Sequence, residues 1–272
     1  MIINSVPAYT DPMLVDRVDG NLFEFYAYAA AAAGKPCARR TGFSFVSLRP
    51  SPWANTVFDL DFPEGEGLPP VLAQGIHDGS IPNKVRTGPT SRPLDVERRL
   101  TDALFVLDDV TWGMTLELSS RRRVQPPPEL SLKPLEDDAD FLAFTGIVST
   151  ELIPAGIEAW PAFAGVLAAM GPDRAFGLLG RVGDKAACTA FAFIDGEGVG
   201  GIYFVATDAT MRRRGFAGAI TSTILDELER RGVECCVLHA SEIGRPVYEG
   251  LGFKVECRLA RYHLPESAAH TR

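Results

Sequence analysis

The sequence predicts a mixed α/β protein of the α+β class, in which a mostly antiparallel sheet is flanked by helices and a smaller α/β domain precedes it. Three apolar segments between residues 176 and 207 are separated by turn dipeptides of the kind that join antiparallel strands. An amphipathic helical pattern then leads to a nearly all-apolar run, which is typical of a strand buried on both faces. The second half therefore combines an antiparallel meander with one β-α-β crossover, over residues 201–240.

Residues 121–129 are the predicted boundary between two domains. Three arginines are followed there by three prolines, and consecutive prolines favour a stiff, extended and unpaired backbone. We therefore expect an N-terminal α/β domain over residues 1–120 and a C-terminal domain over residues 130–272. We interpret the arginines at 121–123 as part of a solvated linker.

The first half begins with an alanine-rich helical pattern over residues 22–33, which Asp19 or Asn21 can cap and which ends at Gly34. The further elements expected here are strands at 43–48 and 56–62, a short helix at 71–75, a strand at 84–87, a helix at 93–102 and a strand at 112–118. Trp53 and Asn55 lie on the loop between the first two strands. The tryptophan there either packs over a sheet edge or reaches a binding site.

The second half is predicted from the same patterns. Its expected elements are a strand at 130–134, helices at 137–148 and 154–170, strands at 176–182, 186–194 and 199–207, a helix at 216–231, a strand at 233–239, a short helix from Pro246 to Gly252 and a strand at 253–264.

The composition argues against several classes of protein. A net charge of −8 disfavours a general nucleic-acid or anionic-membrane surface. The apolar run at 26–33 follows acidic rather than basic residues and is too short for a membrane span, so we interpret it as a helix and not as a signal peptide. The cysteines lack disulfide or zinc spacing, which predicts buried thiols in a reducing cytosol, no metal and a cytoplasmic protein. They are Cys37, Cys188, Cys235, Cys236 and Cys257.

A basic and glycine-rich segment, residues 212–218, joins the strand at 199–207 to the helix at 216–231. The first N–H groups of a helix have no partner within the helix, and the helix dipole adds partial positive charge at that end. Such a turn binds anions well. We expect a phosphate or pyrophosphate as the ligand.

Two motifs in this order resemble the GNAT superfamily of N-acetyltransferases, over roughly residues 130–265. The first is the acetyl-CoA signature (Gln or Arg)-x-x-Gly-x-(Gly or Ala), present as Arg212, Gly215 and Ala217. The second is the segment 247–253, which contains Tyr248 and is similar to the family's closing segment before its last strands.

The resemblance implies an acyltransferase that uses acetyl-CoA as cosubstrate and has the GNAT-like fold. The residues implied in cofactor binding are Val205, Ala206, Thr207, Arg212, Arg213, Arg214, Gly215, Phe216, Ala217, Gly218 and Ser241. The strand residues would hydrogen-bond the pantetheine arm through the backbone, and the loop residues would bind the pyrophosphate. Ser241 either lies near the sulfur or caps a helix.

The resemblance also implies catalytic roles for Tyr248 and for the backbone of Val205. A phenol near the sulfur can protonate the departing CoA thiolate, and a backbone N–H can stabilise the oxyanion. The strand before the loop contains no carboxylate where many family members have a glutamate. Water, His239 or Glu151 could accept the proton of the amine, and His239 could equally be a satisfied core residue, so we assign no general base.

The first half faintly repeats the second. Arg92-Pro93 and Leu104-Phe105, followed by a strand, are similar to Arg245-Pro246 and the segment 251–253 before the last strand. This indicates a degenerate GNAT-like domain that walls the acceptor pocket or extends the sheet, with one active site per chain.

We therefore predict an N-acetyltransferase that transfers an acetyl (acyl) group from acetyl-CoA to a primary amine by direct transfer in a ternary complex. The alternative is a noncatalytic acyl-CoA-binding or sensing module. We expect a small-molecule or peptide amine as the acceptor, neither nucleic acid nor membrane as a partner, and allow for a homodimer.

Overall fold

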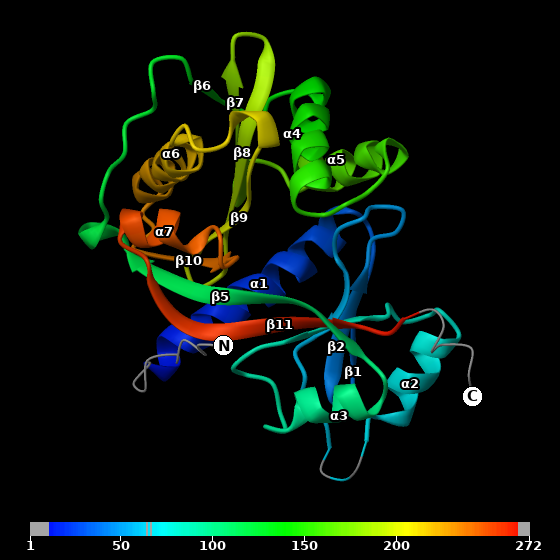
Figure 1. Ribbon diagram of the computed structural model, residues 1–272. Helices are drawn as coiled ribbons and strands as arrows, with labels where there is room; N and C mark the ends of the chain where they lie inside the picture. The colour runs from blue at the N-terminus through cyan, green and yellow to red at the C-terminus, as the bar shows by residue number, and fades with distance from the viewer. Residues whose placement is uncertain (1–10, 64, 66, 266–272) are drawn as a thin grey trace.

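In the computed structural model, which describes residues 11–63, 65 and 67–265, the described strands form one eleven-stranded sheet (Figure 1). The strands are β1 (Cys37–Arg40), β2 (Phe43–Ser47), β3 (Asn55–Phe58), β4 (Lys84–Thr87), β5 (Val106–Glu117), β6 (Ser131–Pro134), β7 (Ala175–Val182), β8 (Lys185–Ile194), β9 (Gly200–Thr207), β10 (Cys235–Ala240) and β11 (Lys254–His263). Their spatial order is β1-β2-β3-β4-β11-β5-β10-β9-β8-β7-β6. Neighbours are antiparallel except β3 with β4 and β9 with β10, which confirms the predicted fold class.

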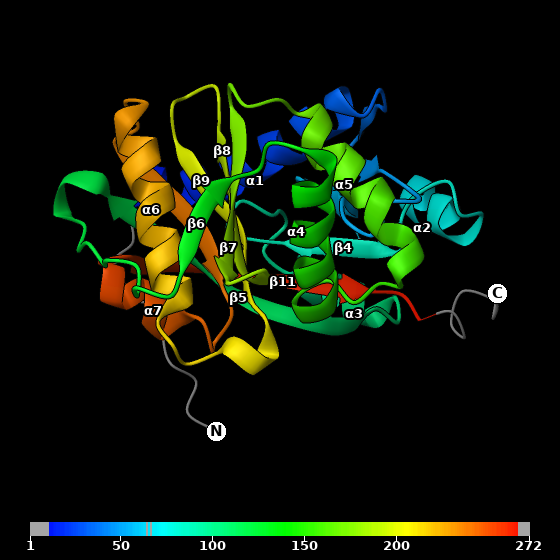
Figure 2. The ribbon, with the colours of Figure 1, turned by 90° about the horizontal axis from the view of Figure 1, so that it is seen from above.

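Helices cover both faces of this sheet. They are α1 (Pro12–Ala32), α2 (Pro70–His77), α3 (Val96–Asp102), α4 (Asp138–Glu151), α5 (Trp160–Ala169), α6 (Phe216–Arg230) and α7 (Arg245–Leu251). Seen from above, α6 lies on one side of β7, β8 and β9, and α4 and α5 lie on the other (Figure 2). Each side has its own apolar cluster: Phe216 and Ile224 belong to the one beneath α6, whereas Phe25, Phe144 and Phe163 belong to the one beneath α1, α4 and α5.

The two halves of the chain exchange a long strand. β5, from the first half, lies between β10 and β11 and pairs with β10 over its residues Trp112 to Glu117. β11, from the second half, lies between β5 and β4 and pairs with β4 through Ala260 to His263. The sheet is therefore continuous across the predicted boundary at 121–129. The assignment of separate domains to 1–120 and 130–272 stays a prediction.

The first half repeats the order of elements in the second. α3 and α7 are each followed by a residue with a left-handed backbone, Leu104 (φ 68°) and Gly252 (φ 107°), and then by a buried phenylalanine. The phenylalanines are Phe105 and Phe253, which lead into β5 and β11. Each half also contains one parallel strand pair, β3 with β4 and β9 with β10. This part of the predicted repeat is thus present in the backbone, whereas Arg245-Pro246 begins α7 and Arg92-Pro93 precedes α3.

Several local predictions differ from the structure. β1 was not predicted, and the strand expected at 56–62 ends at Phe58. α1 begins at Pro12, because Asp11 caps it by accepting the amide of Met13 at 2.9 Å, so the predicted caps Asp19 and Asn21 lie within the helix. α3 begins at Val96, which leaves Pro93 outside it. β5 begins at residue 106 rather than 112, because its exposed first residues pair with β11, and this pairing has no local signal.

The linker is not solvated throughout. The side chain of Arg121 is only 3% exposed, and its Nη2 lies 2.7 Å from Asp226 Oδ1 and 2.6 Å from Glu229 Oε2 of α6. The amide of Val124 donates to Ser222 Oγ of the same helix at 3.0 Å. The interpretation of the arginine triplet as a solvated linker was therefore wrong for Arg121, because α6 presents two carboxylates to it.

Candidate functional site

The strands β9 and β10 separate near the centre of the sheet. Their register runs through three pairs, and the last joins Ile202 to Leu238, although β9 continues to Thr207 and β10 to Ala240. On its other side, β9 has an irregularity against β8, where Phe204 has a left-handed backbone (φ 52°) and Val205 has no partner in the register. Backbone groups of β9 beyond Ile202 are thus available on the side that faces β10.

The predicted phosphate-binding loop leads directly from this strand into α6. Gly215 is the N-cap residue of α6, and its φ of 80° is one that glycine adopts without strain. No side chain caps the helix, and a Cβ at residue 215 would have nothing within 4 Å among the described residues. The loop therefore has the open helix N-terminus that an anion requires.

The three loop arginines have different surroundings. Arg212 pairs with Glu151, whose side chain is 10% exposed and also accepts the amide of Ala209 at 3.0 Å. Arg214 lies 3.1 Å from Glu129 Oε1 and stacks on Phe216. Arg213 is exposed, and within the described part of the chain its side chain has no hydrogen bond or ion pair. Both carboxylate oxygens of Glu151 are thus held, by Arg212 and by the amide of Ala209, which disfavours Glu151 as the base.

A cavity of about 270 Å³ brings together the predicted residues Val205, Ser241 and Tyr248. Tyr248 belongs to the apolar cluster beneath α6, whereas Trp53 and Tyr26, which also line the cavity, belong to the cluster on the opposite face. The cavity therefore connects the two faces of the sheet where β9 and β10 separate. The predicted loop residues 212–218 do not line it and follow the C-terminal end of β9, beyond Thr207.

Tyr248 is held by packing alone. Its side chain is 9% exposed, its ring lies 6.1 Å from that of Phe253, and burial raises the pKa of its phenol above the ordinary value. Among the described residues, its hydroxyl has no hydrogen-bond partner. Ser241 lines the same cavity and also caps the turn before α7, because its Oγ accepts the amide of Gly244 at 3.1 Å. The N-cap residue of α7 is Gly244 and no side chain caps this helix, so Ser241 is not its cap. The position of Ser241 near the sulfur stays a prediction.

His239 faces the cavity in its neutral form. Burial and the nearby charge of Arg86 lower the pKa of this imidazole from 6.5 to about 3. Its Nε2 is buried and has no hydrogen-bond partner within the described chain, whereas the ring hydrogen-bonds the backbone of Val18. The imidazole is therefore only partly satisfied. His239 is therefore a neutral ring on the wall of the cavity.

The first half of the chain also contributes side chains to the wall of this cavity. Trp53 and Asn55 line the cavity, as the sequence allowed, and Tyr203 does so from β9. Trp160 instead packs against Gly146, and its Nε1 donates to Ala155 O at 3.4 Å. Sequence reasoning missed the charged wall residues, which are Lys84, Arg86, Asp109 and Arg261. The basic residues Lys84 and Arg86, at alternate positions of a four-residue strand, were the signal for this wall in the sequence. Only the strand exchange shows that β4 reaches the cavity.

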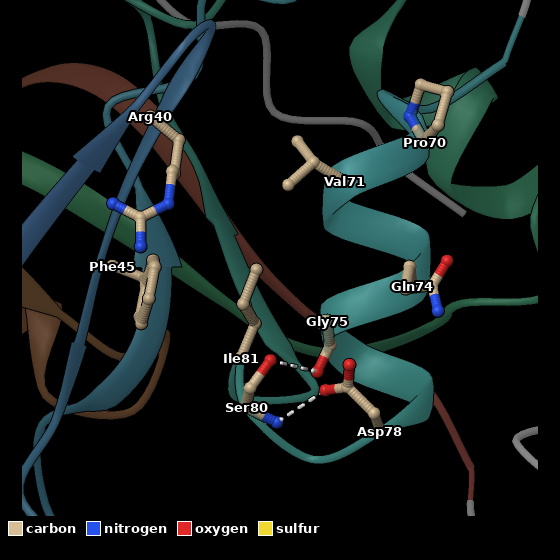
Figure 3. A pocket seen from close by; sticks show the side chains of 9 residues that line it. All are labelled: Arg40, Phe45, Pro70, Val71, Gln74, Gly75, Asp78, Ser80 and Ile81. Carbon is tan, nitrogen blue, oxygen red and sulfur yellow. Dashed lines mark hydrogen bonds between the residues drawn. The ribbon is translucent and has the colours of Figure 1, made fainter.

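A second cavity, of about 420 Å³, lies between α2 and the β1–β2 hairpin (Figure 3). Arg40 and Phe45 form one wall, and Val71 and Gln74 of α2 form the other. Its lining includes no predicted site residue. Among the described residues, no group of three metal-ligating side chains is present, and no helix is long and apolar enough to cross a membrane.

Comparisons with known proteins agree with this geometry. Residues 198–255 match the family model of the acetyltransferase (GNAT) domain. No curated protein sequence matches the chain. A GCN5-related N-acetyltransferase from Kribbella flavida is similar in structure, with a TM-score of 0.63 and 12% identity over 89% of this chain and 95% of that one.

Two further structures are similar over almost the whole chain. A GCN5-related N-acetyltransferase from Sphaerobacter thermophilus has a TM-score of 0.55 and 15% identity, over 95% of this chain and 96% of that one. A tandem GNAT protein from the clavulanic acid biosynthesis pathway has a TM-score of 0.54 and 12% identity, over 91% and 94%. At these identities the likeness shows the fold.

Proposed function

We propose, from the premise that residues 198–255 match a GNAT acetyltransferase domain within a GNAT fold, that this protein is an N-acetyltransferase. It transfers the acetyl group of acetyl-CoA to a primary amine in a ternary complex. The observation that carries the proposal is that β9 and β10 separate beyond Ile202 and Leu238, between the open N-terminus of α6 and the phenol of Tyr248.

Binding of CoA would use two parts of the chain. The amides of residues 213–218 and the exposed Arg213 would hold the pyrophosphate, since Arg212 and Arg214 are paired with carboxylates. The backbone of β9 from Val205 to Thr207 would hydrogen-bond the pantetheine arm along the unpaired edge. This arrangement directs the thioester into the cavity that Val205, Ser241 and Tyr248 line.

Transfer then needs three events. The amine nitrogen attacks the thioester carbon, the C–S bond breaks, and the nitrogen loses a proton. The N–H of Val205 stabilises the oxyanion, and Tyr248 gives its proton to the departing thiolate. The raised pKa of Tyr248 keeps the phenol protonated before this step, as a proton donor requires. The proton acceptor stays unassigned between water and His239.

Direct transfer is favoured over an acyl-cysteine intermediate. No cysteine lines the cavity, and burial raises the pKa of Cys188 to about 12 and raises the pKa of Cys236 and Cys257 as well. Thiols with such pKa values supply little thiolate at neutral pH. The free thiols also support a reducing compartment, so we place the protein in the cytoplasm.

Release of free CoA tests the proposal. Purified protein with acetyl-CoA should release CoA in the presence of a broad panel of primary amines, and mass spectrometry should detect the N-acetyl product. Binding of acetyl-CoA without release across the panel would instead establish the noncatalytic module.

A further inference from the structure

We infer that the acceptor is an amine that also carries a carboxylate, and that Arg86 of β4 binds this carboxylate. The inference rests on the proposed function and names the acceptor class of the same site. It comes from the charges on the cavity wall that the first half of the chain provides.

The cavity wall carries more positive than negative charge. Its lining contains three cations, Lys84, Arg86 and Arg261, and one carboxylate, Asp109. Arg261 is already neutralised, because its Nε lies 2.6 Å from Asp108 Oδ2 and its Nη2 lies 3.7 Å from Asp109 Oδ2. Lys84 is exposed at the end of β4. Arg86 is therefore the half-buried cation of the wall that no acidic side chain of the described residues contacts.

Within the described residues, the side chain of Arg86 makes no hydrogen bond or ion pair, and its Nε is buried without a partner. Asp19 is an acidic group whose charge interacts with Arg86: burial raises the pKa of this carboxyl, and the guanidinium lowers it. Its Oδ2 accepts both the amide and the hydroxyl of Thr90, at 3.1 and 2.6 Å, and its Oδ1 is buried without a hydrogen-bond partner among the described residues. Asp19 thus uses Oδ2 for Thr90 and makes no ion pair with the guanidinium. Half-buried guanidinium groups normally pair with an anion.

The position of Arg86 suits an acceptor rather than CoA. Its charge acts on Tyr203 and on His239, both of which line the cavity, so the guanidinium lies on the side of the first half, away from the loop 212–218. A guanidinium matches a carboxylate with two parallel N–H···O bonds. A single guanidinium without an anionic partner is neutralised by one negative charge. A carboxylate carries one such charge, whereas a dianionic phosphate carries two.

The test compares L-amino acids with their primary amides, which keep the amine and the side chain but lose the carboxylate. Wild-type protein should acetylate the acids with a higher kcat/KM than the amides. In the variant Arg86→Gln, kcat/KM for the acids should fall about 10- to 100-fold, mainly through KM, and for the amides less than about 3-fold. Arg86→Lys should recover part of the loss.

Arg40→Gln, on the second cavity, is the matched control and should leave every value unchanged. The KM for acetyl-CoA should be the same in all four proteins, which separates a folding defect from an acceptor effect. Equal losses for acids and amides in Arg86→Gln, or no preference for acids in the wild type, would overturn the inference while leaving the acetyltransferase intact. If neither acids, amides nor other amines lead to CoA release, the proposed function itself fails.

Discussion

Ile202 of β9 and Leu238 of β10 face each other in the last registered pair of the parallel strands at the centre of the sheet. Both side chains line the cavity that contains Val205, Ser241 and Tyr248. Beyond them the two strands, which the structure describes in full, share no further pair. The separation leaves backbone donors and acceptors of β9 facing the cavity, which is what an extended ligand needs.

Gly215→Glu should raise the Kd for acetyl-CoA by about 100-fold, measured by calorimetry, because a carboxylate would stand at the N-terminus of α6 where phosphate is expected. Gly232→Glu is the matched control, since residue 232 has a φ of 82° and open surroundings like residue 215, at the other end of the helix. It introduces the same charge and backbone strain but should not change the Kd. Equal affinity in both variants would refute the loop assignment.

Tyr248→Phe should lower kcat by about 100-fold with little change in the KM for acetyl-CoA, because only the proton donor is lost. Thermal stability should stay close to that of the wild type, since the hydroxyl has no partner among the described residues. Tyr28→Phe serves as the control: it removes a hydrogen bond to Met170 O outside the cavity and should leave kcat unchanged. Full turnover in Tyr248→Phe would exclude it as the general acid.

His239 should make the protein less stable in acid. Its pKa lies at about 3 in the folded protein and at 6.5 ordinarily, so the unfolded chain binds this proton first as the pH falls. The contribution of His239 is thus fully present above pH 6.5 and is lost progressively below it. Between pH 6.5 and 5, the free energy of unfolding should fall by up to about 2 kcal/mol more in the wild type than in His239→Gln, measured with urea.

Identical slopes for wild type and His239→Gln would show that this imidazole is not held neutral by burial.

Arg121 and Arg123 offer a matched pair, since both contact Asp226 and Glu229 but their side chains are 3% and 58% exposed. Arg121→Ala should lower the free energy of unfolding by about 1 to 3 kcal/mol, through lost packing and lost charged hydrogen bonds. Arg123→Ala should cost less than about 1 kcal/mol, because solvent screens an exposed pair. Denaturation curves that rank the two variants in the opposite order would contradict this account.

Elements with strong local periodicity were predicted closely. The predicted segments 186–194, 199–207 and 216–231 correspond to β8, β9 and α6, because alternating strands and an amphipathic helix are encoded within the segment itself. The start of β5 was missed because its first residues, which include Val106 and Leu107, are exposed and are fixed as a strand by pairing with β11. A local sequence pattern contains no information about a strand partner that is distant in the chain.

The candidate site also has one part that local sequence patterns predicted and another that they could not predict. The order of a strand, the loop with Gly215 and an amphipathic helix is a local pattern, and so is the later segment with Tyr248, which is why both could be proposed from the sequence. His239 and Glu151 could not be ranked as bases until the structure showed that Glu151 pairs with Arg212 and that His239 lines the cavity.

By itself, the sequence determined the crossover that places Gly215 at a helix N-terminus and the fold class that surrounds it. Only the tertiary structure decided which side chains face the cavity of the proposed site. The exchange of β5 and β11 carries Arg86, Asp109 and Arg261 to the cavity beside Tyr248, although these residues are far apart in the chain. The physical reason is that strand order depends on pairing between distant segments, whereas helix starts and strand periodicity depend on neighbours.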